Sequence, residues 1–208
     1  MTRHVNFNAG PSTLPLPVLE RVQKEFLDFE GSGMSLIEHS HRGKVYEAVH
    51  NDTIALLTEL LQIPDSHQVL FMQGGASAQF ALVPMNLRSD ARAGDYVVTG
   101  TWAQKALSEA KLLGKAHSAW NGEHEGTWTR VPKASELDLT ADAPYVHLTS
   151  NNTIMGTQFF DFPDTGKVPL IVDMSSDIMW RPTDVSKFGM IYAGAQKNMG
   201  PSGITCLI

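Results

Sequence analysis

Two short apolar runs in the second half of the chain each end in a polar cluster. Residues 170–172 (LIV) precede Asp173, and residues 190–193 (MIYA) precede GAQKN, which contains Lys197. Continuous β-branched and apolar runs of this length are typical of buried strands in a parallel sheet. Because ligands bind beyond the carboxyl ends of such strands, we expect Asp173 and Lys197 to share one rim of the sheet.

Three earlier apolar runs follow the same pattern. Strands are predicted at 69–72, 95–100 and 145–149, and a strand-like run begins again at 203. The first three are followed by GGAS with Ala76 and Ser77, by Trp102, and by the polar residues 151–153. Five clusters are therefore expected on one rim, and this convergence is stronger evidence for a site than any single cluster.

Helical periodicity appears mainly in the first half. Val18, Val22, Phe26 and Phe29 recur at steps of four, four and three and predict an amphipathic helix over 16–29. A second helix is predicted over 44–61, with a buried line at Val45, Val49, Leu56 and Leu60, and shorter helices follow GGAS and Trp102. Alternating strands and helices indicate an α/β fold with a mostly parallel central sheet. Residues 115–143 carry no recognisable catalytic signal.

The amino-acid composition of the chain excludes several classes of function. The 208 residues are 42% hydrophobic, which suffices for one large domain or for part of a longer protein. A net charge of -6 argues against nucleic-acid binding and against a polybasic membrane patch. The lone cysteine excludes an internal disulfide, and the sequence shows neither an apolar leader nor a membrane span, so we expect a cytoplasmic protein. No metal site is predicted. The chain ends inside a strand-like run, so we expect it to be the first part of a longer protein.

Together, the rim residues fit pyridoxal phosphate. A lysine amine forms a Schiff base with the cofactor's aldehyde, an aspartate keeps the pyridine nitrogen protonated, an aromatic side chain stacks on the ring, and a helix N-terminus binds the phosphate. Each residue also has a simpler interpretation. GGAS is otherwise a tight turn, Trp102 a packing residue, Asp173 a cap of the turn at 175–176, and Lys197 a solvated lysine.

The segment HSHRG at 39–43 allows two interpretations. In the simpler one, which we favour from the residues alone, His39, His41 and Arg42 form a solvated helix entry with a local ion pair to Glu38 or Glu47. The alternative is recognition of an anionic substrate by His41 and Arg42, because guanidinium matches carboxylate and phosphate geometry.

The chain resembles the phosphoserine aminotransferases, a family of class V, fold-type I pyridoxal-phosphate enzymes. The resemblance runs along the whole sequence and rests on FNAGPSTLP at 7–15, HSHRGKVYE at 39–47, QGGASAQFALVPMN at 73–86, Trp102, TSNNTIMGTQF at 149–159 and VDMSSDIMWRPTDVSKFGMIYAGAQKNMGPSG at 172–203. Trp180 departs from the serine expected before Arg181-Pro182. The resemblance implies a three-layer fold in which 1–15 is an N-terminal segment and 16–208 is an incomplete cofactor-binding large domain, without the small C-terminal domain.

The resemblance also implies roles for the cofactor-binding residues. Lys197 would hold the cofactor covalently and shuttle the proton, and Asp173 would pair with the pyridine nitrogen. Trp102 would stack on the ring, and Thr153 would lie beside its phenolic oxygen. The phosphate would be bound by the amides of Ala76 and Ser77, the Ser77 hydroxyl and Gln196.

For the substrates, the resemblance implies reversible amino transfer between L-glutamate and 3-phosphohydroxypyruvate, giving 2-oxoglutarate and O-phospho-L-serine in serine biosynthesis. Related members also serve pyridoxine biosynthesis. His41 and Arg42 would recognise the substrate through its phosphate or carboxylate, with a dimer interface as one route to the site, and Ser12 would lie near the substrate carboxylate. A homodimer with shared active sites is implied.

Three rivals remain. Another class V enzyme, such as a cysteine desulfurase, would need a mobile nucleophilic cysteine, whereas Cys206 lies in an apolar run typical of a core residue. A fragment that only binds or oligomerises is favoured by the abrupt ending. A nucleotide-binding module is disfavoured because no nucleotide fingerprint is present.

Overall fold

A central sheet organises the chain in the computed structural model, which describes residues 3–89 and 91–208. The sheet has seven strands in the order β1-β9-β8-β7-β4-β2-β3. Its strands are β1 (Leu70–Gln73), β2 (Gly94–Val98), β3 (Ala116–Asn121), β4 (Val146–Thr149), β7 (Leu170–Asp173), β8 (Met190–Gly194) and β9 (Ile204–Leu207). A separate two-stranded ribbon consists of β5 (Asn151–Asn152) and β6 (Thr157–Gln158).

Six of the strands run in one direction. The pairs β2·β3, β2·β4, β4·β7 and β7·β8 are parallel, whereas β9 is antiparallel to both of its neighbours, β8 and β1. The predicted mostly parallel sheet is therefore confirmed. The strands predicted around 69–72, 95–100, 145–149, 170–173 and 190–193 all form, and the run at 203–208 contains β9.

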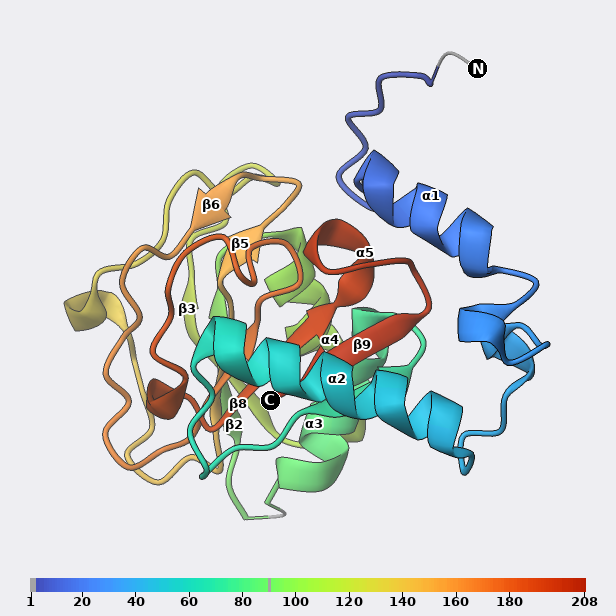
Figure 1. Cartoon of the computed structure of the whole chain (residues 1–208). Coiled ribbons are helices and arrows are strands. Elements are labelled where there is room, and N and C mark those ends of the chain that lie inside the picture. Colours follow the sequence, from blue (N-terminus) through green and yellow to red (C-terminus); the bar gives the residue numbers. More distant parts are fainter. Residues whose placement is uncertain (1–2, 90) are drawn as a thin grey trace.

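Helices cover both faces of the sheet, which gives three layers (Figure 1). Helices α3 (Gln79–Leu87) and α4 (Thr101–Leu113) pack on one face in a cluster that includes Phe80, Tyr96 and Leu107. The other face packs against the end of α2 (Lys44–Leu61) and against irregular segments, in a cluster that includes Leu57, Leu148 and Phe159. The remaining helices are α1 (Leu16–Glu25), the four-residue α5 (Ala195–Asn198) and the short 3-10 turns η1 (Phe29–Gly31), η2 (Leu36–Glu38), η3 (Ala76–Ala78), η4 (Ala134–Glu136) and η5 (Val185–Lys187).

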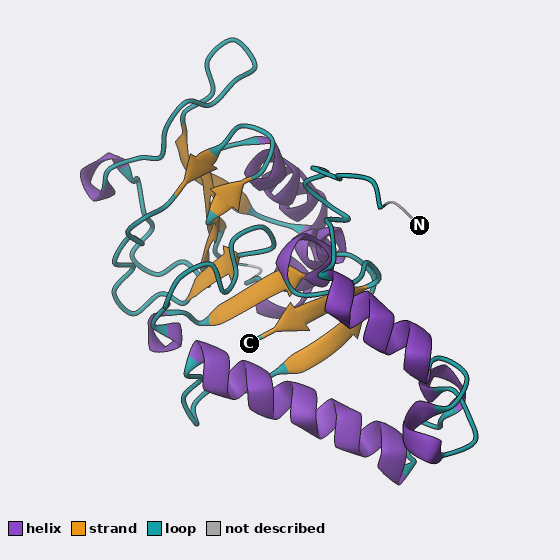
Figure 2. Cartoon of the chain, turned by 45° about the horizontal axis from the view of Figure 1, so that its top comes forward, coloured by secondary structure: helices purple, strands orange, loops and turns teal. Residues whose placement is uncertain are grey.

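The first helix is shorter and more exposed than predicted. Helix α1 ends at Glu25 rather than at residue 29, and Phe29 belongs to the separate turn η1. Of the four apolar positions used for the prediction, only Phe29 is buried; Val18, Val22 and Phe26 are about half exposed. Figure 2 shows α1 and the start of α2 extending beyond the sheet, which explains why this apolar stripe has no core to face.

Helix α2 has the predicted bounds, but its predicted buried line is wrong. Leu57 and Leu61 are buried, whereas Leu56 and Leu60 are 58% and 67% exposed. Only the C-terminal half of the helix reaches the core cluster, through Leu57 and Leu61 with Ile54 partly buried against it. The spacing of three and four residues places these side chains on one side of the helix.

Strand β3 was not predicted from the sequence. Its residues AHSAWN contain no continuous apolar run, and it lies at the edge of the sheet beside β2 only. Among the described residues, none of the helices is both long enough and apolar enough to cross a bilayer.

Candidate active site

The carboxyl ends of the co-directional strands frame a cavity of about 430 Å³. Its lining comes from the N-terminal segment and from the segments that follow β1, β2, β4, β7 and β8. The lining residues are Ala9, Gly10, Gly75, Ala76, Ser77, Phe80, Trp102, Thr153, Ile154, Ser175, Gly194, Gln196 and Lys197. The volume lies in the range of small-molecule sites. The structure thus brings six of the predicted residues to one cavity: Ala76, Ser77, Trp102, Thr153, Gln196 and Lys197.

Lys197 lies on α5, directly after β8, and its amine points toward two other predicted residues. Nζ donates a hydrogen bond to Oγ1 of Thr153 at 2.7 Å and lies 5.1 Å from the centroid of the Trp102 ring. Burial lowers the pKa of Lys197, while the negative charges of Asp173 and Asp177 oppose that shift. The side chain is therefore a half-buried amine in a polar and aromatic setting, rather than a lysine in free solvent.

Asp173 ends β7 and is only 5% exposed. Its Oδ1 accepts hydrogen bonds from the amide and hydroxyl of Ser175, at 2.9 and 2.6 Å. Burial raises the pKa of Asp173, while these hydrogen bonds and the charge of Lys197 act in the opposite direction. The capping interpretation is correct, but it does not compete with a ligand role, because the cap uses only Oδ1.

Ser175 was considered in the sequence only as part of the capped turn, yet it lines the cavity. Its hydroxyl also accepts a hydrogen bond from the amide of Gly194 at 3.0 Å. Ser175 therefore connects the ends of β7 and β8, the two strands that carry Asp173 and lead to Lys197. Ser175 lies two residues after Asp173 in the sequence, and this proximity could have indicated its role.

The GGAS segment forms the predicted turn from strand to helix. Gly74 has φ +90°, a left-handed conformation that favours glycine, and η3 and α3 follow. The amides of Ala76 and Ser77 belong to the first turn of the helical segment, where N–H groups have no intrahelical acceptor. A Cβ on Gly194 would lie 3.2 Å from Cβ of Ala76, so glycine at this position lets the turn approach β8 closely.

Trp102 lies in the first turn of α4, and a buried asparagine from the predicted cluster 151–153 supports this turn. Oδ1 of Asn152 accepts from the amide of Ala103 at 3.4 Å, and Nδ2 donates to Oγ1 of Thr99 at 2.8 Å. Asn152 is fully buried, and a Cβ on Gly100 would lie 2.5 Å from its side chain. The start of α4 is thereby fixed against the segment that carries Thr153.

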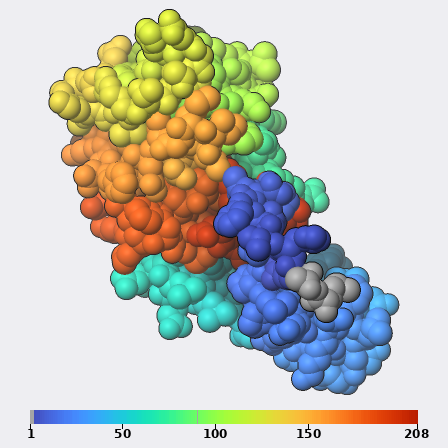
Figure 3. Space-filling model, turned by 90° about the horizontal axis from the view of Figure 1, so that it is seen from above, coloured from blue at the N-terminus to red at the C-terminus, as the bar shows by residue number. Residues whose placement is uncertain are grey.

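The N-terminal segment lies across α5. The amide of Ser12 donates to the carbonyl of Gln196 at 2.8 Å, and its hydroxyl donates to the carbonyl of Lys197 at 2.5 Å. A Cβ on Gly10 would lie 3.0 Å from Cγ of Lys197. Figure 3 shows this N-terminal segment, in blue, against the red C-terminal residues. Ser12 thus fixes the backbone of Lys197, and its contact with a substrate carboxylate stays a prediction.

His41 and Arg42 do not line the cavity. They line a separate hollow of about 450 Å³ at the start of α2, together with Tyr46, Glu47, His50 and Asn51. Within the described residues, Arg42 makes no ion pair with Glu38 or Glu47, and Glu38 instead accepts from the amide of Ser35. The simpler interpretation therefore lacks its ion pair, and substrate recognition by these residues stays a prediction.

Cys206 is a core residue, as predicted. It is 2% exposed on β9, and burial raises the pKa of its thiol to about 11. A thiol that is buried and protonated is a poor nucleophile, which argues against desulfurase chemistry.

These residues fit pyridoxal phosphate on structural grounds. Within the described part of the chain the buried carboxylate of Asp173 forms no ion pair, and it suits a protonated ring nitrogen. The Trp102 ring offers a stacking surface, the amides of Ala76 and Ser77 suit a phosphate, and Lys197 supplies the amine. The donor set and the cavity volume thus define the class of the site as that of a pyridoxal-phosphate enzyme.

Comparison with known proteins agrees with this class. The chain belongs to the class-V aminotransferase family, whose profile matches residues 4–208. It is 58% identical over 206 residues to the phosphoserine aminotransferase of Niallia circulans, covering 99% of this chain and 57% of that relative. The chain therefore spans little more than half the length of the curated relatives it matches.

Solved structures show the same similarity. The phosphoserine aminotransferase of Bacillus circulans subsp. alkalophilus superposes with a TM-score of 0.94 at 57% identity, over 97% of this chain and 56% of that one. A phosphoserine aminotransferase from Trichomonas vaginalis, solved with bound pyridoxal phosphate, superposes with a TM-score of 0.92 at 41% identity, over 99% of this chain and 57% of that one.

Proposed function

We propose that this chain is the cofactor-binding large domain of a phosphoserine aminotransferase, with residues 1–15 as its N-terminal segment and 16–208 as the domain itself. The whole protein would transfer an amino group reversibly between L-glutamate and 3-phosphohydroxypyruvate, giving 2-oxoglutarate and O-phospho-L-serine. The observation that carries the proposal is the meeting of Lys197, Trp102, Thr153 and the GGAS turn around one cavity. Asp173 does not line this cavity itself, but it is hydrogen-bonded to Ser175, which does. The names of the relatives support the substrate assignment.

Pyridoxal phosphate, when bound, supplies an aldehyde that reacts with amines and an aromatic ring that accepts electrons. The chain's own groups prepare for this chemistry. A lowered pKa increases the fraction of neutral Lys197 amine, the form that attacks a carbonyl. Thr153 orients that amine through the 2.7 Å hydrogen bond. Asp173 holds a proton at the ring nitrogen, and Lys197 moves a proton at the substrate carbon.

The remaining substrate contacts involve groups at a distance from this cavity. His41 and Arg42 suit a phosphorylated substrate because charge-assisted hydrogen bonds to a dianion are strong, and their position outside the cavity supports a homodimer in which they serve the partner's site. The share of the relatives' length that the chain spans supports a small C-terminal domain that completes the substrate site. We further propose a cytoplasmic role in serine biosynthesis, with pyridoxine biosynthesis as a second role.

Reduction with borohydride tests the cofactor assignment. The protein is incubated with pyridoxal phosphate, reduced, digested and mapped by mass spectrometry, and a pyridoxyl-phosphate adduct is expected on Lys197. Lys105 offers a matched control, because its exposed ammonium lies 4.7 Å from the same Trp102 ring, compared with 5.1 Å for Lys197. Lys197→Ala should abolish the adduct and Lys105→Ala should retain it.

An adduct spread equally over both lysines, or no adduct at all, would refute the cofactor site. The substrate assignment needs a separate measurement on the whole protein. Formation of 2-oxoglutarate from glutamate should require 3-phosphohydroxypyruvate and should not proceed with unphosphorylated hydroxypyruvate at a comparable rate. Equal rates with both oxo acids would refute the phosphorylated substrate.

A further inference from the structure

Two buried polar side chains lie next to Asp173 on the same face of the sheet. Tyr192 on β8 is the register partner of Asp173, and His147 on β4 is the register partner of Ile171, two residues before Asp173. Register partners point to the same side of a sheet, and so do residues two apart along a strand. Tyr192 and His147 are 0% and 1% exposed. The cofactor chemistry described above does not use either residue.

The two side chains contact one another. Nε2 of His147 lies 2.9 Å from the hydroxyl of Tyr192. The neighbouring Tyr96 ring packs against His147 in a tilted arrangement, with ring centroids 5.0 Å apart, but its own hydroxyl pairs with that of Tyr145 at 2.7 Å. The hydroxyls of Tyr96 and Tyr145 thus bond to each other, and of the two pairs only His147–Tyr192 contains the register partner of Asp173.

The direction of the hydrogen bonds follows from His147. Burial lowers the pKa of His147 to about 3, so the imidazole is neutral and carries one N–H. Its Nδ1 has no hydrogen-bond partner anywhere in residues 3–89 and 91–208. A buried N–H without an acceptor is costly, so the proton belongs on Nε2, which donates to Tyr192.

The hydroxyl proton of Tyr192 is then free to be donated to Asp173. Burial raises the pKa of Tyr192, and the negative charge of Asp173 raises that pKa further, so the phenol stays protonated. The hydrogen bond from His147 therefore leaves the hydroxyl proton of Tyr192 for another acceptor, and its register partner Asp173 is the candidate. Apart from burial, the groups that shift the pKa of Asp173 are Ser175, Lys197 and Asp177.

We propose that Tyr192 and His147 are positioning residues that keep the carboxylate of Asp173 ionised and oriented toward the cavity. Their importance for the cofactor rests on the proposed function. Asp173 is buried where its charge is unfavourable, and Ser175 supplies hydrogen bonds to Oδ1 from one side only. A donor on the neighbouring strand completes the support of the carboxylate, and His147 orients that donor.

The titration of Asp173 in the cofactor-free protein tests the proposal. The protein is labelled with ¹³C at aspartate carboxyls, and the Asp173 resonance is followed against pH. Tyr192→Phe should raise the titration midpoint by about one pH unit, a roughly tenfold change in proton affinity. Tyr145→Phe is the matched control, because it removes a buried phenol from the same sheet face without touching His147 or Asp173, and it should leave the midpoint unchanged.

A second pair of variants separates orientation from packing. His147→Leu removes the donor to Tyr192 and should raise the Asp173 midpoint, whereas His147→Gln keeps an N–H near the position of Nε2 and should restore the parent value. These two variants carry the test if Tyr192→Phe does not fold. In the cofactor-loaded protein, Tyr192→Phe should weaken pyridoxal-phosphate binding about tenfold relative to Tyr145→Phe, measured by the visible absorbance of the bound cofactor.

Equal Asp173 midpoints in Tyr192→Phe and Tyr145→Phe, or in His147→Leu and His147→Gln, would overturn the proposal. Its failure is distinguishable from failure of the proposed function. If pyridoxal phosphate does not bind, the proposed function fails while the titration of Asp173 still reports on Tyr192 and His147. If Lys197 forms the adduct but the midpoints coincide, only the positioning role is wrong.

Discussion

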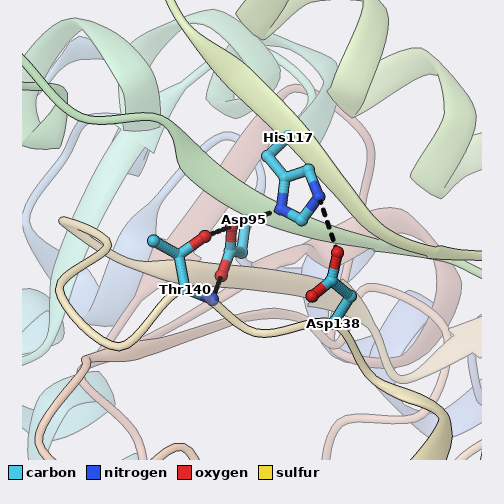
Figure 4. Close-up of polar contacts among 4 residues, drawn as sticks. All are labelled: Asp95, His117, Asp138 and Thr140. Carbon is cyan, nitrogen blue, oxygen red and sulfur yellow. Dashed lines mark hydrogen bonds and ion pairs between the residues drawn. The ribbon is translucent and has the colours of Figure 1, made fainter.

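A buried carboxylate at the opposite end of the sheet from the cavity provides a sharp test of what stabilises the fold. Asp95, the second residue of β2, is 0% exposed. Figure 4 shows its contacts. Its Oδ1 accepts from Nδ1 of His117 at 2.9 Å and from the hydroxyl of Thr140 at 3.0 Å, and its Oδ2 accepts from the amide of Thr140 at 2.6 Å. His117 also lies 3.4 Å from Asp138. These contacts attach the loop before β4 to the amino ends of β2 and β3.

Asp95→Ala removes the acceptor for all three donors. Hydrogen bonds to a charged group contribute about 1.5–3 kcal/mol each, but Thr140 and His117 are partly exposed and water replaces some of the loss. We therefore expect the free energy of unfolding to fall by about 2–4 kcal/mol. Asp95→Asn keeps the shape and one acceptor oxygen, so it should cost about half as much.

Urea unfolding followed by circular dichroism measures these changes. Asp142→Ala is the control, because the Asp142–Arg92 ion pair, at 3.5 Å, has side chains that are 67% and 51% exposed, and exposed pairs contribute about 0–1 kcal/mol. The borohydride adduct on Lys197 should persist in all three variants. A loss in Asp95→Ala within about 0.5 kcal/mol of the control would refute the role assigned to these hydrogen bonds.

Three further predictions concern the site and the core. Gly100→Ala places a Cβ 2.5 Å from the Asn152 side chain, so urea unfolding should show that the free energy of unfolding falls by about 1–3 kcal/mol. Titration with pyridoxal phosphate should also show weaker binding. An unchanged free energy of unfolding and an unchanged affinity would contradict the tight packing. Cys206 should react with a thiol reagent at pH 8 only after unfolding, because it is buried and the pKa of its thiol is about 11, and rapid reaction of the native protein would contradict this. Burial raises the pKa of Asp173, so its ionisation in the folded protein costs stability as pH rises through the folded-state pKa. The cofactor-free Asp173→Asn variant should therefore match the parent in free energy of unfolding below pH 3.8 and exceed it at pH 7. A difference in free energy of unfolding that does not depend on pH would contradict the direction of this pKa shift.

The rim of the sheet was predictable because its signals are local. An apolar run specifies a buried strand, and the polar residues directly after it must then lie at the strand's carboxyl end. This reasoning placed Ala76, Trp102, Thr153 and Lys197 around one cavity, which the structure confirms. Ser175 was considered only as part of a capped turn and Asn152 only as one of the polar residues 151–153, because their individual roles depend on Gly194 and Thr99, which are far away in sequence.

The helices at the start of the chain were less predictable for a physical reason. Periodicity shows which side of a helix is apolar, but it does not show whether a core lies opposite that side. Val18 and Val22 on α1 and Leu56 and Leu60 on α2 follow helical spacing, yet all four are 46–67% exposed. The buried contacts of α2 are made instead by Leu57 and Leu61, one residue along from each predicted position.

The residue types alone also did not determine the direction of the pKa shifts in the site. The sequence predicted Asp173 and Lys197 on one rim, but the direction of their pKa shifts depends on burial, which raises the pKa of Asp173 and lowers that of Lys197. Burial therefore moves both groups toward their neutral forms, and their mutual attraction only opposes this. A neutral amine suits attack on a carbonyl, whereas a neutral Asp173 does not suit a cationic ring. The fold thus has to support the charge of Asp173 separately, and Ser175 on one side with Tyr192 on the other provides that support without restoring the charge of Lys197.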